Sequence, residues 1–212
     1  MALKEELEKA LAELRKNNEE RKFKQSVDLI INLQKFDAKK TPLNLFVQVP
    51  NQIKEKKIAG FLEIKHKKID IFTDAEFRKY SDKKEIKKLV NKYDFFIAQA
   101  SLMPKVASTF GRILGPAGKM PSPQLGILIN VDEKNVNELL EKINRSVKIR
   151  VKEPSIKVAI GKENMKDEEI IENILAVYNF VLKNLPKEKE NLKNLEIKFT
   201  MSNPKKIKLN KK

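Results

Sequence analysis

Three of the six glycines in this chain lie in one short stretch, residues 108–123, as Gly111, Gly115 and Gly118. Three prolines are interspersed with them, and the only charged residues of the stretch are Arg112 and Lys119. Glycine permits backbone conformations that other residues avoid, whereas proline fixes φ and removes a hydrogen-bond donor. The sequence therefore predicts a specific, stiff loop with exposed amides and cations, suited to close approach by a phosphate or by another backbone.

The positive net charge of the chain indicates which classes of molecule it could bind. The 212 residues include 45 basic and 29 acidic ones, which leaves a formal net charge of +16. A field of this sign concentrates polyanions near the surface, so RNA, DNA and an anionic membrane face are the candidates. A thermophile-like surface rich in Lys and Glu would also be highly charged, but it does not explain the imbalance. We therefore favour a nucleic acid as the partner.

Residue types that carry much protein chemistry are scarce in this chain. It has no cysteine, which excludes disulfides and thiolate metal sites. Its single histidine, His66, stands among lysines, so we expect a solvated side chain rather than a metal ligand. No run approaches the roughly 20 apolar residues of a membrane span, and the polar start does not resemble a signal peptide. We expect an intracellular, cytoplasmic protein with neither metal nor cofactor.

Hydrophobic periodicity indicates two kinds of structural unit. Residues 2–20 have the spacing of an amphipathic helix, and residues 26–33 and 43–49 alternate like two neighbouring strands with one wet face each. In the middle, short apolar runs alternate with helical patterns, which favours a mostly parallel sheet covered on both faces. The runs are residues 58–64, 69–72, 95–98 and 126–130, and the helices are residues 83–92, 132–144 and a segment from 102 into the glycine-rich stretch.

The character of the first unit returns near residue 146. Residues 146–152, 155–161 and 194–200 have the pattern of strands, of which the last is expected to end the fold, and residues 167–185 that of a long helix. We infer an α/β protein of two domains. A discontinuous α+β domain is formed by residues 1–52 and 146–212, and an inserted α/β domain is formed by residues 53–145.

Basic side chains gather around the strands of the discontinuous domain. Phe23 stands between two lysines just before a strand, where it could pack on bases and sugars or belong to the core, and composition favours neither. On the returning strands, alternation gives each strand an apolar and a cationic side. The cationic candidates there are Lys148, Arg150, Lys152 and Lys157, and those near the end of the chain are Lys205, Lys206 and Lys208.

The glycine-rich stretch does not match a nucleotide-binding loop. A phosphate-cradling P-loop needs Gly, four residues, then Gly-Lys and a hydroxyl residue. Here Met120 follows Lys119, and Ile113 stands where the first glycine would be. No nucleophile, base and orienting group are evident together either, so we do not expect an enzyme. A nucleotide-dependent enzyme that uses the middle domain, and a general nucleic-acid binder, stay open as alternatives.

Several segments resemble one known family. Residues 95–104, Phe-Phe-Ile-Ala-Gln-Ala-Ser-Leu-Met-Pro, and residues 111–121, Gly-Arg-Ile-Leu-Gly-Pro-Ala-Gly-Lys-Met-Pro, are similar to the signature of ribosomal protein L1. Residues 22–27, residues 160–162 and the pair Thr200-Met201 resemble the other motifs of that family. The resemblance extends over nearly the whole chain and is to the archaeal branch.

The resemblance implies a fold and a function. The discontinuous domain would carry the RNA-binding surface, and the inserted domain would be Rossmann-like. Such proteins are structural components of the large ribosomal subunit, bind its ribosomal RNA at the mobile side stalk and assist release of exit-site tRNA. Several also bind a similar structure in the leader or coding region of their own mRNA and repress its translation. They are cytoplasmic, ribosome-associated and monomeric when free.

The resemblance also implies which residues bind RNA. They are Lys22, Phe23, Ser26, Asp28, Arg150, Lys152, Lys157, Thr200 and Met201. We add Ser202, which follows them and could use its hydroxyl in the same contact. An acidic Asp28 among cations makes sense if it accepts hydrogen bonds from ribose hydroxyls or orients a lysine. Ser202 is a departure, because the family usually has glycine directly after Thr-Met. A structural, interdomain or secondary RNA-facing role is implied for Gly111, Arg112, Gly115, Gly118 and Lys119.

Overall fold

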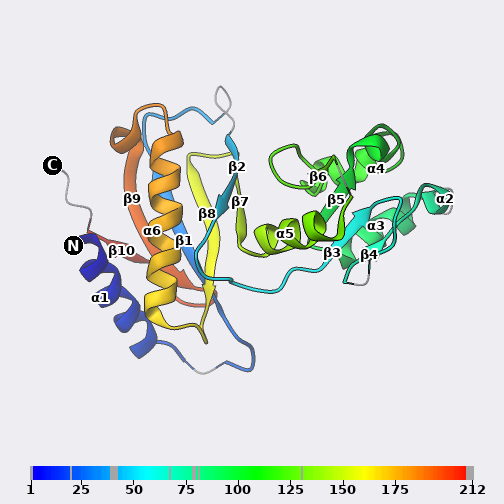
Figure 1. Cartoon of the computed structure of the whole chain (residues 1–212). Coiled ribbons are helices and arrows are strands. Elements are labelled where there is room, and N and C mark those ends of the chain that lie inside the picture. Colours follow the sequence, from blue (N-terminus) through cyan, green and yellow to red (C-terminus); the bar gives the residue numbers. More distant parts are fainter. Residues whose placement is uncertain are drawn as a thin grey trace. The chain divides into compact units, whose positions relative to one another are not determined.

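The structure is a computed structural model that describes residues 2–19, 21–38, 43–66, 68–77, 80, 82–129 and 131–208. The chain folds into two compact units (Figure 1). Each unit has its own hydrophobic core. Unit 1 consists of Met1–Lys54 and Arg145–Lys212, and unit 2 consists of Glu55–Asn144.

Unit 1 is built on a four-stranded antiparallel sheet of order β10-β9-β1-β8. Its strands are β1 (Ser26–Leu33), β8 (Ser155–Lys162), β9 (Leu192–Phe199) and β10 (Lys205–Ile207). The strand nearest the N-terminus thus lies between two strands from the C-terminal part of the chain. Leu29 of β1, for example, is opposite Val158 on one side and Ile197 on the other. The two ends of the chain therefore form one sheet, as expected.

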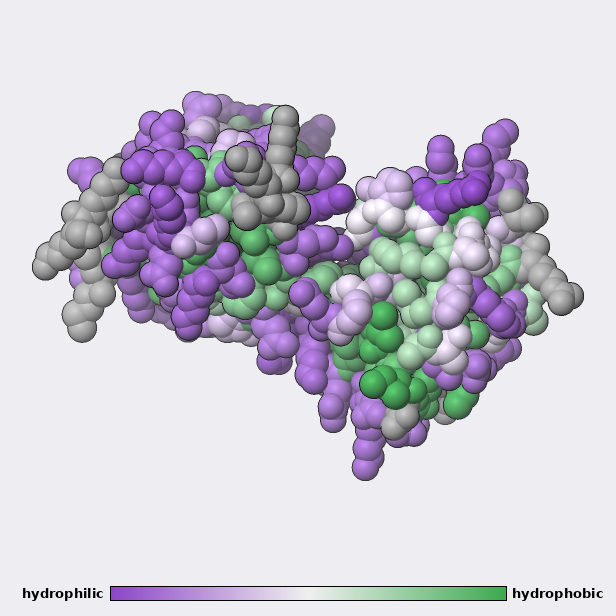
Figure 2. All heavy atoms as spheres, turned by 90° about the horizontal axis from the view of Figure 1, so that it is seen from above, coloured by the Kyte–Doolittle hydropathy of each residue, from purple (hydrophilic) through white to green (hydrophobic). Residues whose placement is uncertain are grey.

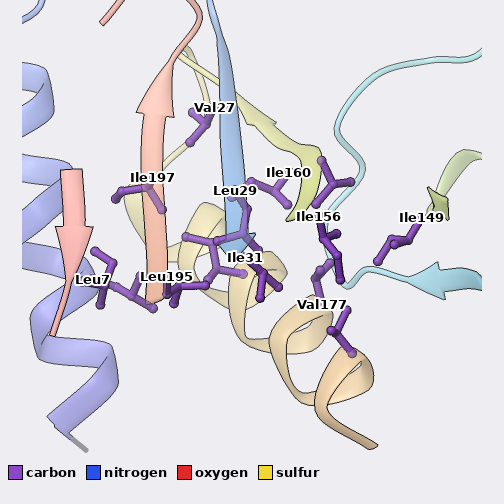
Figure 3. Close-up of a cluster of buried hydrophobic side chains, with 14 of the residues drawn as sticks. Leu7, Val27, Leu29, Ile31, Ile149, Ile156, Ile160, Val177, Leu195 and Ile197 are labelled. Atoms are coloured by element: carbon purple, nitrogen blue, oxygen red, sulfur yellow. The ribbon is translucent and has the colours of Figure 1, made fainter. Parts of the chain in front are cut away.

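One face of this sheet is covered by helices α1 (Ala2–Lys16) and α6 (Asp167–Asn184) (Figure 1). Alternation along β1 turns its apolar residues to this face, where Leu29 and Ile31 are fully buried. Figure 3 shows them with Val177 of α6 and Leu7 of α1, which also belong to the core. The acidic first turn of α6 favours helix formation there, because the N-terminal end of a helix attracts negative charge.

Strands β2 (Leu43–Gln48) and β7 (Ser146–Val151) form a separate antiparallel ribbon within unit 1. The expectation that the first two strands are neighbours is therefore wrong. Both edges of β1 are occupied by β8 and β9, so β2 pairs with β7 instead. The ribbon stays attached to the rest of the unit because Val47 and Ile149 join its hydrophobic core.

Unit 2 contains a sheet of order β4-β3-β5-β6 in which all three strand pairs are parallel. Its strands are β3 (Ile58–Phe61), β4 (Asp70–Ile71), β5 (Phe95–Gln99) and β6 (Ile127–Leu128). Every residue of β3 is buried, as expected for a parallel sheet covered on both faces. The helices of unit 2 are α2 (Asp74–Phe77), α3 (Lys83–Lys92), α4 (Met103–Ala117) and α5 (Glu133–Asn144), and the short 3-10 turns of the chain are Ala100–Leu102 and Glu188–Asn191.

Aromatic rings dominate the core of unit 2. Phe61 of β3 stacks on Phe96 of β5 with ring centres 5.6 Å apart, and the ring centre of Phe110 lies 5.0 Å from that of Phe61. Phe77 meets Phe61 edge to face at 5.6 Å. Such pairs stabilise a core beyond the burial of their area. The rings thereby fasten α2 and α4 to the parallel sheet.

The glycine-rich stretch is not one loop, which corrects the strongest expectation from the sequence. Helix α4 extends to Ala117 and includes Gly111 and Gly115. Each glycine costs a helix roughly 1 kcal/mol relative to alanine, but Phe110 and Leu114 on the same helix are fully buried and hold it against the core. Gly118, with φ 70°, adopts the left-handed conformation that ends the helix. Only the residues after it form a loop.

Three smaller expectations also differ from the structure. The N-terminal helix ends at Lys16 rather than near residue 20, and β9 is not the last strand because β10 follows it. A three-residue strand with two lysines has too little apolar pattern to be recognised. His66 is half-buried, and its Nδ1 accepts a hydrogen bond from the backbone N–H of Lys68 at 3.2 Å, so it is not a freely solvated side chain. Asn130, the end of one expected strand, lies outside the described residues.

Two glycine substitutions should change the stability of unit 2 in opposite directions. Gly126 has φ +123°, and a Cβ there would lie 3.2 Å from both the Phe95 ring and the Phe96 carbonyl oxygen. We expect Gly126→Ala to lower the free energy of unfolding by about 1–3 kcal/mol. A Cβ at Gly111 would meet nothing within 4 Å, so Gly111→Ala should raise it by about 1 kcal/mol through helix propensity. Denaturant unfolding measures both, and shifts of the same sign would contradict either the strain expected at position 126 or the gain expected at position 111.

Candidate nucleic-acid interface

The face of the unit 1 sheet opposite the helices is polar and mainly cationic. β1 turns Ser26, Asp28 and Ile30 to this outer face, because its buried residues occupy the other. Lys198 of β9 is paired with Asp28, and Lys157 of β8 is paired with Ile30. Figure 2 shows that hydrophilic residues cover most of unit 1 on the side in view. The outer face therefore combines hydrogen-bonding groups with positive charge.

Asp28 occupies an electrostatically mixed position on this face. Partial burial raises the pKa of the Asp28 carboxyl above its ordinary value, while the positive charges of Lys198 and Lys162 act in the opposite direction. Lys162, at the end of β8, also donates a hydrogen bond from Nζ to Ser26 Oγ at 2.8 Å. The effect of burial is larger than that of the two lysines, so the ionised carboxylate is less stable in the free protein than in water. A ligand that donates hydrogen bonds to it would relieve this.

Phe23 and Met201 are large apolar side chains that unit 1 leaves exposed, by 51% and 59% respectively. They precede β1 and follow β9, and they lie at the same end of the sheet because the two strands are antiparallel. The segments are joined there, since the backbone N–H of Ser26 donates to Thr200 Oγ1 at 3.0 Å and the N–H of Thr200 donates to the Ser26 carbonyl at 3.1 Å. The structure therefore decides against a core position for Phe23.

A buried amide, Gln25, fixes the backbone of Met201. Gln25 is 1% exposed, and its Oε1 accepts a hydrogen bond from the Met201 N–H at 3.0 Å. Its Nε2 donates to Asn18 Oδ1 at 2.7 Å, and Asn18 in turn donates to the Glu163 carboxylate. Glu163 also accepts from the backbone N–H of Gln25 at 3.1 Å. A satisfied buried network of this kind is rigid, so Met201 is held in place before any ligand arrives.

Ser202 stabilises the turn that follows β9. Its Oγ accepts a hydrogen bond from the backbone N–H of Phe199 at 2.9 Å, and its own N–H donates to the Phe199 carbonyl at 3.1 Å. Among the described residues, the non-glycine positions with positive φ are Lys35 and Glu188, so Ser202 adopts no conformation that requires glycine. The Ser202 hydroxyl thus forms a hydrogen bond within the turn. Because the backbone there does not require glycine, serine can stand where the family that the sequence resembles usually has glycine.

Arg150 and Lys152 do not lie on the strands of the four-stranded sheet. Arg150 is exposed on the β2–β7 ribbon, opposite Asn44, and Lys152 is exposed just after β7. Next to them, Lys148 Nζ lies 5.1 Å from the centre of the Phe46 ring. Burial, with a smaller contribution from Arg150, lowers the pKa of Lys148. The structure gathers Lys22, Phe23, Ser26, Asp28, Lys157, Thr200, Met201 and Ser202 around one sheet, whereas Arg150 lies on the ribbon and Lys152 directly follows it.

Lys119, in unit 2, has a structural role. Its Nζ donates hydrogen bonds to the carbonyl oxygens of Val90 at 2.7 Å and Tyr93 at 2.8 Å. Both carbonyls lie at the C-terminal end of α3, where a positive charge is favourable. This argues against an RNA-facing ammonium, one of the roles considered from the sequence. Arg112 is exposed on α4, and Gly111 and Gly115 are helical, so these residues do not form one loop with Gly118 and Lys119.

Replacing Lys119 should destabilise unit 2. Lys119→Met keeps most of the side-chain length but leaves two carbonyls at the end of α3 without their donor, which should cost about 1–3 kcal/mol. Arg112→Met is the matched control, because it removes an exposed cation from the same signature and should cost less than about 0.5 kcal/mol. Denaturant unfolding of the two variants gives the comparison. An equal loss of stability in both would show that Lys119 does not cap α3.

Sequence reasoning missed part of this interface. Lys198 alternates with buried Ile197 and Phe199, so the rule of alternation alone could have placed it on the outer face. Lys162 belongs to the family-like segment of residues 160–162 and ends β8, so a signal in the sequence could have placed it at the interface. Gln25 and Asn18 carry no such signal, because a polar residue in a charged segment is ordinarily solvated. Only the tertiary arrangement makes them part of a buried network.

Two searches of the described residues bear on other functions. No group of three or more His, Asp or Glu side chains in that part of the chain could hold a metal ion. No helix there is both long and apolar enough to cross a membrane.

An open sheet face with cations, hydrogen-bonding groups and exposed apolar side chains is typical of nucleic-acid-binding proteins. Comparison with known proteins is more specific, because the model of the ribosomal protein L1p/L10e family matches residues 14–203. The chain is 39% identical to large ribosomal subunit protein uL1 of Pyrobaculum calidifontis, over 97% of this chain and 94% of that protein.

Other archaeal relatives agree. The chain is 36% identical to uL1 of Nanoarchaeum equitans, over 88% of this chain and 92% of that protein. It is 38% identical to uL1 of Methanothermococcus thermolithotrophicus, over 96% of this chain and 98% of that protein. The chain therefore belongs to the ribosomal protein L1p/L10e family, which is a family of ribosomal proteins rather than of enzymes. The resemblance to its archaeal members is confirmed.

Proposed function

We propose that this protein is a structural component of the large ribosomal subunit and that unit 1 binds large-subunit ribosomal RNA at the mobile side stalk. Its relatives are named as proteins of the large subunit. The observation that carries the RNA-binding part is the exposed pair Phe23 and Met201 at the end of a cationic sheet face, where the Met201 backbone is held by Gln25. Exposed apolar side chains beside cations suit a ligand with flat faces and a charged backbone.

Each group on the outer face has a proposed role. Helical RNA hides its base edges in a deep groove, so proteins bind it through shape, phosphates and ribose hydroxyls. Lys22, Lys157 and Lys198 neutralise phosphates, which makes binding depend on salt. Phe23 and Met201 pack on sugars or unstacked bases. Asp28 accepts hydrogen bonds from ribose 2′-hydroxyls, which DNA lacks.

Further roles rest on the resemblance of the motifs. We propose that the protein assists release of exit-site tRNA and that it represses translation by binding a similar structure in its own mRNA. The mRNA role would use the same outer face, since one surface can bind two RNAs of similar shape. The protein is proposed to be cytoplasmic and ribosome-associated, and monomeric when free.

The two units are proposed to be separate domains with different tasks. Unit 1 would be the RNA-binding domain, and unit 2 an inserted Rossmann-like domain, in keeping with its parallel strand order β4-β3-β5-β6. The alternative of a nucleotide-dependent enzyme gains no support from unit 2, because Gly111 and Gly115 lie inside α4 rather than in a phosphate loop.

Removing either exposed apolar side chain should weaken RNA binding. We expect Phe23→Ala and Met201→Ala to lower the affinity for large-subunit ribosomal RNA about 5- to 100-fold, as contacts of this kind are worth roughly 1–3 kcal/mol. Fluorescence anisotropy at fixed salt measures the affinity. The RNA is a fragment of the organism's own large-subunit ribosomal RNA, chosen because it stays bound to the wild-type protein.

The matched control is Ile64→Ala in unit 2, because Ile64 is also a large, exposed apolar side chain. It should leave the affinity within twofold of wild type. If all three variants bind alike, Phe23 and Met201 are not part of the RNA site.

Replacing Asp28 should separate stability from binding. Its folded-state pKa is raised, so the ionised carboxylate is less favourable in the folded than in the unfolded protein. Its contribution to stability therefore falls as pH rises from the unfolded value near 3.8 through the folded pKa. Asp28→Asn should remove that fall. Compared with the wild-type protein, the variant should therefore gain free energy of unfolding between pH 3 and neutral pH. It should also bind RNA about tenfold more weakly, since a hydrogen bond to a charged group is worth roughly 1.5–3 kcal/mol.

Thermal unfolding between pH 3 and 7 and anisotropy at pH 7 measure the two effects. Glu138→Gln is the control, because it removes a carboxylate from an exposed position on α5 in unit 2, outside the proposed RNA-binding face, and it should change neither quantity. If Asp28→Asn leaves the RNA affinity unchanged, Asp28 is not part of the RNA site.

A further inference from the structure

A groove of about 350 Å³ lies directly beside Met201 in unit 1. One wall is the C-terminal end of α1 and the residues after it, including Asn17, and the other wall is the turn between β9 and β10, including Asn203 and Pro204. Its volume falls near the lower end of the range of about 300–1,000 Å³ for small-ligand sites. Met201 belongs both to this groove and to the exposed apolar pair on the sheet.

The charged side chains that line the groove are paired with each other. Lys205 of β10 forms an ion pair with Glu13 of α1, which joins the two walls. Arg21 Nη2 lies 2.7 Å from the Glu19 carboxylate. Because each cation in these pairs has an adjacent carboxylate, the groove is a poor site for a phosphate. The chemistry of its walls instead suits a neutral ligand.

Two amides remain to bind such a ligand. Asn17 and Asn203 both line the groove and are exposed, so their side-chain amides are accessible to a ligand. Each amide offers a donor and an acceptor, the combination that recognises the edge of a nucleobase. The Met201 thioether is apolar and polarisable, and it can pack on the flat face of a base.

The turn that carries these groups is rigid. Its backbone is fixed by the hydrogen bonds of Met201 to Gln25 and of Phe199 to Ser202. The opposite wall is anchored as well, since Arg15 of α1 donates to the carbonyls of Glu163 at 2.9 Å and Met165 at 2.8 Å. A preformed groove loses little freedom when a ligand enters it, which favours binding.

We propose that this groove holds one unstacked nucleobase of the bound RNA, recognised at its edge by Asn17 and Asn203 and packed against Met201. This inference rests on the proposed RNA-binding function and adds a sequence-reading subsite to it. The base must come from a loop, bulge or junction, because a base inside a duplex cannot be turned outward without losing its partner. The groove would thus supply base selectivity that the outer sheet face, which contacts phosphates and ribose, does not.

The test uses the full-length protein and the ribosomal RNA fragment that it retains from the organism's own large-subunit RNA. Reagents that modify the Watson–Crick edges of the four bases are applied to the free and the bound fragment. We expect the wild-type protein to protect at least one unpaired base. In the Asn17→Ala/Asn203→Ala double variant, that base should become as reactive as in free RNA, and affinity should fall about tenfold.

Controls separate a base contact from other effects. Asn91→Ala changes an exposed amide on α3 of unit 2 and should leave protection and affinity as in wild type. Asn17→Leu, which blocks the groove without touching the turn, should act like the double variant.

The outcomes also distinguish this proposal from the function on which it rests. If the wild type and the double variant give the same protections and affinity, the groove proposal is overturned while RNA binding stands. The groove proposal is overturned too if the double variant loses every protection on the fragment, since it would then disrupt the turn rather than one base contact. If the wild type retains no ribosomal RNA fragment in preference to duplex DNA at matched salt, both proposals fail.

Discussion

The pairing of β1 with β8 on one edge and β9 on the other is the interaction on which unit 1 depends. It places a strand from the start of the chain between two strands that follow unit 2 in sequence. Both ladders run along nearly the whole of β1, so its backbone polar groups are satisfied while its apolar side chains enter the core beneath α1 and α6. The same pairing sets Asp28 opposite Lys198 and brings Thr200 to Ser26. The core and the outer face are thus two consequences of one strand register.

Electrostatics explains why the proposed binding face can include an acidic residue. Cations spread over the outer face repel one another in the free protein, and Asp28 between Lys162 and Lys198 reduces that repulsion. At the end of the sheet, the side-chain amide of Gln25 connects the residues after α1 with the turn at Met201, and its backbone N–H binds Glu163 in the loop after β8. A hydrophobic residue at that position could fill the space but could not direct the Met201 backbone. The site therefore depends on polar groups that contribute little to core packing.

Much of the fold, but less of the site, could be predicted from the sequence. Alternation identified β1, β7 and β8 closely, and helical spacing identified α6, because each has one buried face. It could not choose strand partners, and β2 was assigned the wrong neighbour. The glycines of α4 led to a wrong prediction, because their local propensity favours a loop. Burial of Phe110 and Leu114 in the core keeps this segment helical despite its glycines. The resemblance pointed to Phe23 and Met201, but the groups that hold Met201 became visible only when segments distant in sequence were brought together.

The exposure of Phe23 and Met201 is itself a consequence of this rigidity. Burying a large apolar side chain stabilises a protein by about 1.5–3 kcal/mol relative to leaving it exposed, so a flexible segment would tend to fold such residues back onto the surface. Here the segments on either side are hydrogen-bonded to each other through Ser26 and Thr200, and the Met201 N–H is held by Gln25. The backbone at Thr200 and Met201 therefore cannot fold back onto the surface without breaking these hydrogen bonds. A partner that covers the two side chains therefore gains the burial free energy without first having to order the protein, which is the physical basis for placing recognition at this end of the sheet.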